Sequence, residues 1–418
     1  MLSPEENEVL TRTGPGTPMG TLMRRYWVPA LFSHQLPEPD CPPLRIRLLN
    51  EDLVAFRDSN GHVGLLDQRC PHRGASLFFG RNEECGLRCV YHGWKFDVQG
   101  NCVDMPNEPA ESSFKHKIKQ VAYPCQERGG VVWAYLGEPA RQPGLPELEW
   151  SLVPESQRFA TRHRQECNWF QALEGGFDTS HVPILHGGFA AGPNVAPTLK
   201  IVPTAYGFML GTGRPLDQER CYWGVNQWLM PWYKLITRNN PDSTIGTHAW
   251  VPIDDENTMV WSIEYHPDRP LSDQELEHSQ SWRYIHLENQ PGSDRTVLNK
   301  GNDYLVDREL QRSGQSFTGI YGLGAQDTAM QESMGPILDR TIEHLGAADG
   351  AIIGLRRGLL KALKDLDDGL EPLGLDPTSQ HIRSTSVILP AGTPFSEESV
   401  ADFVKARSAA AEPQPVAV

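Results

Sequence analysis

The chain has 418 residues, a formal net charge of −15 and 39% hydrophobic residues. Because single hydrophobic cores rarely grow beyond about 250–300 residues, this length predicts two domains. The acidic charge, without a dense Lys/Arg block, argues against nucleic acid as a partner. The acidic N-terminus does not resemble a secretory signal. No run of about 20 apolar residues is present to span a membrane, so we expect a cytoplasmic protein with no membrane partner.

The first part of the chain is predicted to be a helical arm followed by an all-β domain. Apolar residues recur among polar ones in residues 1–30, which favours helix. From 44 to about 137, short apolar runs alternate with glycine-containing turn signals, which is typical of hairpins. A Pro- and Glu-rich linker covers 138–160. We expect a first domain over 1–150, a second over 151–405 and a disordered tail over 406–418.

The second part begins with a helix candidate at 168–181, and strand-like runs follow from 198 to 265. The chain becomes helical again towards its end. Asp349 is predicted to cap a helix over 351–366, where apolar residues recur at helical spacing. The fold class expected from these elements is α+β.

Two mixed Cys/His pairs lie in the all-β region: Cys70-x-His72 and Cys89-x2-His92. Structural zinc sites usually contain Cys–Cys or His–His pairs, so a zinc-stabilised binding module is the weaker alternative. One cysteine and one histidine on each of two loops suit a [2Fe–2S] cluster, in which two cysteines hold one iron and two histidines hold the other. Nearby proline and glycine residues are expected to make both loops tight.

The motif C-P-H-R-G…C-x-Y-H-G-W resembles the Rieske family. Respiratory Rieske proteins carry an additional cysteine beside each loop motif, and these form a disulfide. In this chain Ala75 and Tyr91 occupy the matching places. The chain is therefore more similar to the Rieske oxygenases and ferredoxins.

A second candidate metal site lies in NWFQALEGGFDTSHVPILHGG, residues 168–188. His181 and His186 are five residues apart, and we expect a break near Pro183 to turn both imidazoles to one point. Glu174, Asp178 and His181 have the spacing of one helix face. Two histidines and a carboxylate form the facial triad of non-haem Fe(II) oxygenases.

Together, the two motifs resemble the catalytic subunit of Rieske non-haem iron oxygenases, from about residue 20 to 360. The opening TRTGPGTPMG and the later QDTAMQES are most similar to the phthalate dioxygenase branch and its O-demethylase relatives. The resemblance implies a helix-grip-like catalytic domain, an antiparallel sheet covered by helices. It also implies that His181 and His186 bind a mononuclear iron and that Asp178 is a bridging residue. Asp327 is the expected third ligand.

Two further carboxylates, Glu332 and Asp339, compete with Asp327 for the third ligand position. We expect Asp339, which precedes Arg340, to form an ion pair instead.

The resemblance also implies partners. Chains would form a trimer, or a hexamer of stacked trimers, in which Asp178 links His92 of one subunit to His181 or His186 of the next. Since no nucleotide-binding fingerprint is present, a separate flavin and iron–sulfur reductase is expected to oxidise NADH. The oxygenase would then use O2 on an aromatic acid, by cis-dihydroxylation of a phthalate- or benzoate-like ring.

The sequence says less about the substrate. An apolar and aromatic set is suited to a planar ring, although each member is expected to be a core residue when taken singly: Phe177, Ile184, Leu185, Trp223, Trp228, Trp232 and Phe317. Four cations lie in the same region, and each is expected to be solvated: Arg214, Arg220, Lys234 and Arg238. Two alternatives stay open, an O-demethylating or ether-cleaving monooxygenase and a Rieske electron-transfer or redox-sensing protein.

Overall fold

The computed structural model describes residues 1–187, 197–237 and 242–406. They form two units: a small unit, Thr13–Leu145 with Pro252–Asp254, and a large unit, Met1–Arg12, Pro146–Val251 and the described residues from Asp255 onward. The division near Pro146 lies close to the expected boundary at 150. The first twelve residues differ from expectation, because they belong to the large unit. The expected tail at 406–418 lies outside the described residues, apart from residue 406.

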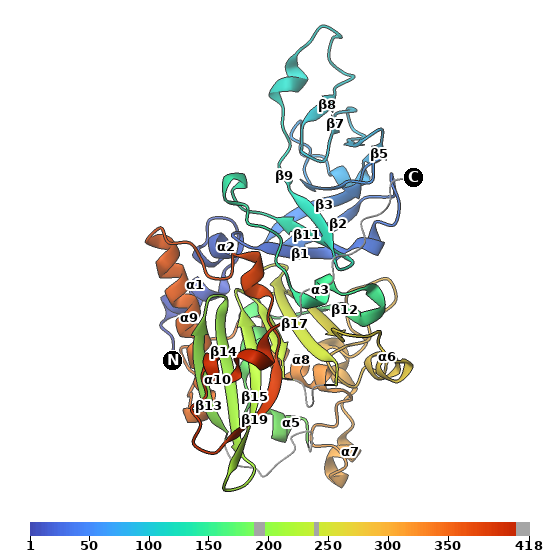
Figure 1. The fold of residues 1–418 in the computed structure, drawn as a ribbon. Coiled ribbons are helices and arrows are strands. Elements are labelled where there is room, and N and C mark those ends of the chain that lie inside the picture. Colours follow the sequence, from blue (N-terminus) through green and yellow to red (C-terminus); the bar gives the residue numbers. More distant parts are fainter. Residues whose placement is uncertain (188–196, 238–241, 407–418) are drawn as a thin grey trace. The chain divides into compact units, whose positions relative to one another are not determined.

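The small unit consists mainly of antiparallel strands (Figure 1). Its three sheets have the strand orders β1-β11-β10, β2-β3-β4-β9 and β5-β6-β7-β8. The strands are β1 (Trp27–Phe32), β2 (Leu44–Leu48), β3 (Glu51–Arg57), β4 (Val63–Asp67), β5 (Arg81–Glu83), β6 (Gly86–Arg88), β7 (Lys95–Phe96), β8 (Cys102–Asp104), β9 (Ala122–Tyr123), β10 (Cys125–Arg128) and β11 (Val131–Tyr135). The predicted all-β domain is therefore confirmed.

The expected N-terminal arm is only partly helical. It contains α1 (Pro4–Thr11) and α2 (Pro18–Met23), and the chain then enters strand β1. Ser3 caps α1 through a hydrogen bond from the backbone N–H of Glu6, and Thr17 caps α2 in the same way through Gly20. Buried Trp27 and Val28 place the end of the arm in the core of the small unit.

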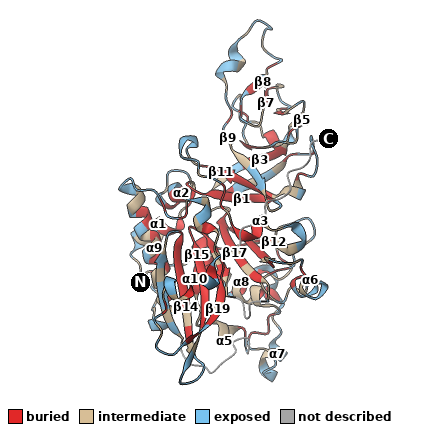
Figure 2. Ribbon diagram, in the orientation of Figure 1, coloured by how far each residue is buried: buried red, intermediate tan, exposed pale blue. Residues whose placement is uncertain are grey.

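The large unit is built on one antiparallel sheet of eight strands (Figure 1). The order is β12-β18-β17-β16-β15-β14-β13, and β19 also pairs with β15. The strands are β12 (Arg158–Gln165), β13 (Thr198–Thr204), β14 (Gly207–Pro215), β15 (Arg220–Leu229), β16 (Tyr233–Ile236), β17 (Ile245–Pro252), β18 (Thr258–Tyr265) and β19 (Thr385–Pro390). Its central strands are largely buried (Figure 2).

Helices accompany this sheet, as the predicted α+β fold requires. They are α3 (Glu149–Leu152), α4 (Trp169–Phe177), α5 (Val182–Leu185), α6 (Asp273–Gln280), α7 (Arg308–Ser313), α8 (Leu323–Ser333), α9 (Gly350–Asp367) and α10 (Glu397–Val404). Helix α9 confirms the predicted C-terminal helix, but the Asp349 side chain does not cap it. That side chain instead accepts a hydrogen bond from the backbone N–H of Gly346, 2.6 Å away.

Helix α4 is packed tightly between the sheet and three other helices. It contacts α1, α8 and α9. Two glycines make this approach possible. A Cβ at Gly175 would lie 2.2 Å from the Gln331 side chain, and one at Gly176 would lie 2.3 Å from the Trp250 ring. The position of α4, and of the chain that leaves it at Asp178, is therefore fixed by close contacts.

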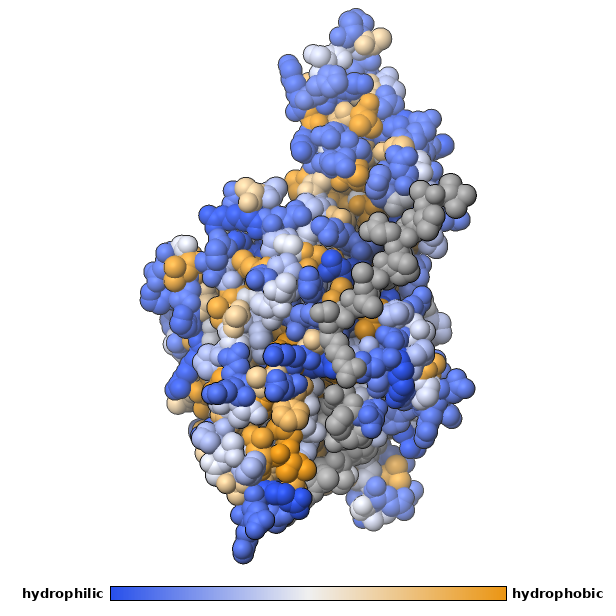
Figure 3. Space-filling model, in the orientation of Figure 1, coloured by the Kyte–Doolittle hydropathy of each residue, from blue (hydrophilic) through white to orange (hydrophobic). Residues whose placement is uncertain are grey.

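The visible face of the molecule is mostly hydrophilic, with hydrophobic side chains scattered among the polar ones (Figure 3). Among the described residues, no helix combines the length and the apolar character needed to cross a bilayer.

Candidate metal centres

The two Cys/His loops of the small unit have the same backbone pattern. In the first, Gly74 N–H donates to the carbonyl of Cys70, and in the second, Gly93 N–H donates to that of Cys89. Both glycines have positive φ values, +74° and +80°, which other residues adopt only with strain. The expected tight loops are confirmed, and each presents its cysteine and its histidine from an equivalent turn.

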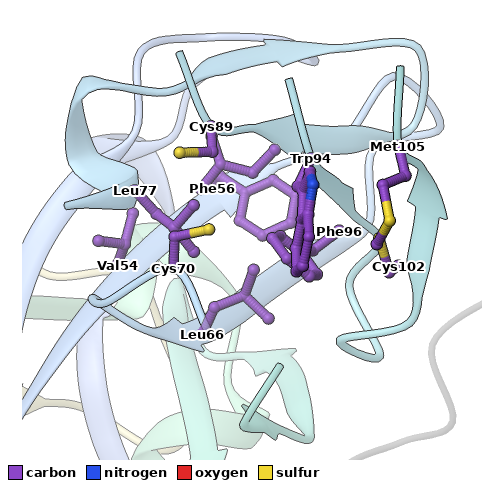
Figure 4. Packing of buried hydrophobic residues seen from close by; sticks show 11 residues of the cluster. Val54, Phe56, Leu66, Cys70, Leu77, Cys89, Trp94, Phe96, Cys102 and Met105 are labelled. Atoms are coloured by element: carbon purple, nitrogen blue, oxygen red, sulfur yellow. The ribbon is translucent and has the colours of Figure 1, made fainter. Parts of the chain in front are cut away.

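The four predicted cluster ligands lie together in the small unit. Cys70 and Cys89 are each 2% exposed and pack with Phe56, Trp94 and Phe96 (Figure 4). The rings of His72 and His92 lie with their centroids 4.4 Å apart. Trp94 stacks on His72 at 4.3 Å, which orients that imidazole.

The donor set fits a [2Fe–2S] cluster. Nδ1 of His72 is buried and has no hydrogen-bond partner among the residues that the structure describes, an arrangement that is costly unless a ligand is bound. Burial raises the pKa of the Cys70 thiol to about 11, and the neighbouring Cys89 acts in the same direction. Without iron the Cys70 sulfur is therefore protonated, and a bound metal would supply the charge that makes it a thiolate.

The second site is in the large unit, where the local structure differs from the expected one. Helix α4 ends at Phe177, and Asp178 is already extended, with φ −69° and ψ 117°. His181 precedes the single turn of α5 and His186 follows it. The prediction that Glu174, Asp178 and His181 share one helix face is wrong, because the helix stops before Asp178. Pro183 lies in the first turn of α5, so it begins a helix there and does not break one.

The two histidines and Asp327 nevertheless meet at one point. Asp327 is on α8, and its Oδ1 lies 3.4 Å from Nε2 of His181 and 3.3 Å from Nε2 of His186. One ligand atom from each residue lies within 4.8 Å of the others, a spacing that can hold a metal ion. The side chain of Asp327 is 34% exposed, whereas that of His186 is 6% exposed. The group is thus partly exposed on the carboxylate side.

A second residue holds each of these imidazoles through its other nitrogen. Oδ2 of Asp178 lies 3.3 Å from Nδ1 of His181, and Oε1 of Gln326 lies 2.8 Å from Nδ1 of His186. These contacts leave both Nε2 atoms directed at Asp327. Metal-binding histidines are oriented in this way in general. The contact of Gln326 with His186 was not predicted from the sequence, although the position of Gln326 directly before Asp327 indicated that it lies near the site.

The charges at this site also suit a cation. Burial would raise the pKa of Asp327, but hydrogen bonds from His181 and His186 lower it to about 2. Burial would lower the pKa of His181, but Asp178 and Asp327 raise it to about 9. In the metal-free protein, His181 therefore carries a proton between two carboxylates, and a divalent ion would replace that positive charge.

The two competing carboxylates are occupied elsewhere. Glu332 accepts a hydrogen bond from the backbone N–H of Glu166 and another from the hydroxyl of Tyr304. Asp339 accepts two from Thr341, so the ion pair expected for it is not what the structure places there. Glu174, which had been expected beside the metal ligands, is paired with Arg340 and Arg356.

The predicted pocket residues fall into different environments. Phe177, Trp228 and Trp232 are fully buried, and Trp223 stacks on Phe395 in the core. Leu185 is half-buried, and Ile184 and Phe317 are exposed.

The four cations of the same region also differ from one another. Arg220 is exposed and pairs with Asp217, and Arg214 is half-buried. Arg238 lies outside the described residues. Lys234 is half-buried and is not the solvated residue that we expected; burial is the main cause of its lowered pKa.

Comparison with known proteins identifies the family of this chain. The Rieske [2Fe–2S] domain model matches residues 26–122, and the LigXa C-terminal domain-like model matches residues 190–415. The chain belongs to the family of Rieske non-haem iron oxygenases, and it is an oxygenase subunit of the aromatic-ring-hydroxylating class.

Several curated proteins are similar to this chain over most of its length. It is 41% identical to the 3-chlorobenzoate-3,4-dioxygenase oxygenase subunit of Comamonas testosteroni, over 91% of this chain and 94% of that one. It is 39% identical to the phthalate 4,5-dioxygenase oxygenase subunit of Pseudomonas putida, over 90% and 89%. A more distant relative, at 32% identity over 89% and 83%, is the 5,5'-dehydrodivanillate O-demethylase oxygenase subunit of Sphingobium sp. (strain NBRC 103272 / SYK-6).

A solved structure shares the fold. Dicamba monooxygenase bound to dicamba superimposes with a TM-score of 0.60 at 18% identity, covering 84% of this chain and 99% of that one.

Proposed function

We propose that this oxygenase subunit cis-dihydroxylates an aromatic acid of the benzoate or phthalate type. The observation that carries the proposal is the convergence of His181, His186 and Asp327, with one ligand atom of each within 4.8 Å of the others. The relatives named for 3-chlorobenzoate and phthalate support the substrate class. In this reaction the ring and O2 take up two electrons and two protons and give a cis-dihydrodiol.

Cys70, His72, Cys89 and His92 would hold the [2Fe–2S] cluster, and His181, His186 and Asp327 would hold the mononuclear iron. When bound, the cluster supplies electrons one at a time and the iron supplies the activation of O2. The protein contributes orientation. Asp178 and Gln326 hold the Nδ1 atoms of the two histidines, so that both Nε2 atoms are available as ligands.

The electrons would come from NADH through a separate flavin and iron–sulfur reductase. Within a trimer or a hexamer, Asp178 would connect His92 of one subunit to His181 of the next. The ionisation state of Asp178 supports this role. Burial would raise its pKa, but hydrogen bonds from His181 and Ser180 lower it to about 2, so it is an anion that can accept from a further imidazole. Its side chain also remains 22% exposed.

An O2-uptake screen tests the proposal. The iron-loaded subunit, a compatible reductase and NADH would be supplied with benzoate, 3-chlorobenzoate and phthalate, and the products analysed. We expect substrate-dependent O2 uptake and a cis-diol. Formaldehyde or a phenol from methoxylated acids, with no diol from the others, would contradict dihydroxylation.

A pair of histidine variants tests the division into two metal sites. His181→Ala should abolish O2 uptake, keep the visible spectrum of the cluster and lower the iron content from about three to about two per chain. His344→Ala changes an exposed histidine of the same unit and should leave all three unchanged. Loss of the cluster spectrum in His181→Ala would argue against two separate sites.

A further inference from the structure

Lys234 is a cation set into the sheet beneath helix α4. It lies on β16, directly opposite His248 on β17. Its ammonium donates a hydrogen bond to the carbonyl of Gly176, in the last turn of α4, and lies 5.7 Å from the centroid of the Phe177 ring. Asp178, which holds His181, follows within two residues of that carbonyl. The lysine is therefore placed on the side of the sheet where the mononuclear site is built.

The charge of Lys234 is not balanced by an ion pair. Throughout the described ranges, 1–187, 197–237 and 242–406, no carboxylate lies within 4.0 Å of its Nζ. The two carboxylates that act on it electrostatically are Asp327 and Asp178, and both are already engaged by histidines. An ammonium has three donors, and the carbonyl of Gly176 uses only one of them. A half-buried cation in this state is stabilised when an anion binds beside it.

His248 adds a neutral donor or acceptor next to the lysine. One ring nitrogen, Nδ1, lies 3.1 Å from the hydroxyl of Ser262. Burial, followed by the charge of Lys234, lowers the pKa of His248 to about 4, so this imidazole is uncharged near neutral pH. The ring of Trp250 lies beside it, with centroids 5.1 Å apart. Lys234 and His248 both keep part of their surface exposed, which distinguishes them from the fully buried side chains of the same strands.

We propose that Lys234, assisted by His248, binds the carboxylate of the aromatic acid and so orients the ring towards the mononuclear iron. The inference rests on the proposed function. One ammonium beside one neutral imidazole matches a single carboxylate, and the aromatic residues around them match a ring. A benzoate with one carboxylate is therefore the ligand that this pair recognises.

The test compares an acid with its neutral analogue. Binding of 3-chlorobenzoate and 3-chlorobenzamide to the iron-loaded wild type, Lys234→Met and Lys234→Arg would be measured by equilibrium dialysis, and O2 uptake would give KM and kcat. We expect the wild type to prefer the acid by about 30-fold or more, because truncating one partner of a buried charge pair has effects of this size. Lys234→Met should lose most of that preference while amide binding changes less than about threefold. Lys234→Arg should keep part of it.

The matched control is Lys200→Met, since Lys200 is an exposed lysine on β13 of the same sheet. Lys200→Met should show the same preference for the acid over the amide as the wild type. An unchanged preference for the acid in Lys234→Met overturns the inference but leaves the proposed function intact. Absence of O2 uptake with every aromatic acid in the wild type overturns the proposed function itself. If Lys234→Met loses iron, Lys234→Arg and His248→Gln are used to test the inference in its place. A ratio of acid affinity to amide affinity that equals the wild-type ratio in both variants overturns the inference.

Discussion

The buried carboxylate of Glu174 provides a stability prediction that can be worked out from the structure. Its Oε2 accepts hydrogen bonds from Arg340 at 3.0 and 2.7 Å, and its Oε1 accepts one from Arg356 at 2.6 Å. Arg340 has no exposed surface, and Glu174 is 4% exposed. This group ties α4 to α9 and to the segment that precedes α9. The substitution Glu174→Gln keeps the shape and removes the charge.

The expected loss is about 3–5 kcal/mol of unfolding free energy, the usual cost of breaking a buried ion pair from one side. Arg356 would still be paired with Glu343, at 2.7 Å, so the main penalty falls on Arg340. Within the described part of the chain, the acceptors left to Arg340 would all be neutral: Asn7, Leu338 and the amide oxygen that the substitution can place at position 174. The estimate for this variant is therefore the lower part of the range, about 3 kcal/mol.

Urea unfolding followed by tryptophan fluorescence would measure the loss, and the visible cluster spectrum would report on the small unit independently. Glu309→Gln is the control, since Glu309 forms a solvent-exposed pair with Arg312, and its midpoint should match the wild type. The double variant Glu174→Gln with Arg340→Met should recover part of the stability, because it removes the unpaired charge. A loss below about 1 kcal/mol in Glu174→Gln would refute the reasoning.

Three further predictions concern the two metal sites and the pH dependence of stability. Gln326→Leu removes the acceptor that holds Nδ1 of His186, so iron affinity should fall about 10–100-fold in a chelator competition, with an unchanged cluster spectrum; equal affinity would contradict this role. Cys89→Ser should remove the visible absorption of the cluster and leave about one iron per chain, and a retained cluster spectrum would exclude Cys89 as a ligand. Burial, then the nearby His248 and His286, lowers the pKa of buried His163 to about 3, well below the value of about 6.5 in an unfolded chain. Its contribution to stability is therefore fully present above pH 6.5 and is lost as the pH falls towards 3, by up to about 1.4 kcal/mol per pH unit. His163→Phe should weaken the drop in melting temperature between pH 7.5 and 5.5, and an unchanged drop would show that His163 is not its source.

The sequence was sufficient to predict those features of this protein whose residues lie close together along the chain. The Cys/His loops could be predicted because each ligand pair lies within four residues and glycine marks each turn. The strands of the small unit could be predicted equally well, since apolar runs alternate with turns there. His181 and His186 were predicted as iron ligands from the family resemblance, because their spacing alone is a weak signal, and the short helix between them was not predicted.

Features that depend on tertiary packing were harder to predict. The end of α4 at Phe177 was missed, because an ideal helix places Glu174, Asp178 and His181 on one face. The actual partners of Glu174 are more than 160 residues away in sequence. The solvent exposure of Lys234 was predicted from the sequence of its strand alone. Only the tertiary structure shows that the end of α4 covers this side chain. Asp349 has the residue type of a helix cap, but its carboxylate is used by a nearby backbone N–H.

The absence of side chains at Gly175 and Gly176 has a consequence for how this enzyme tolerates change. A methyl group at either position would push α4 away from Gln331 or from Trp250, and Asp178 begins immediately beyond the helix. Contacts at 2.2 and 2.3 Å would require a displacement of about 1 Å to reach ordinary van der Waals separation, and such a shift would spoil the alignment of His181 with Asp327. Damage at these two positions should therefore first appear as a folded protein that has lost its catalytic iron.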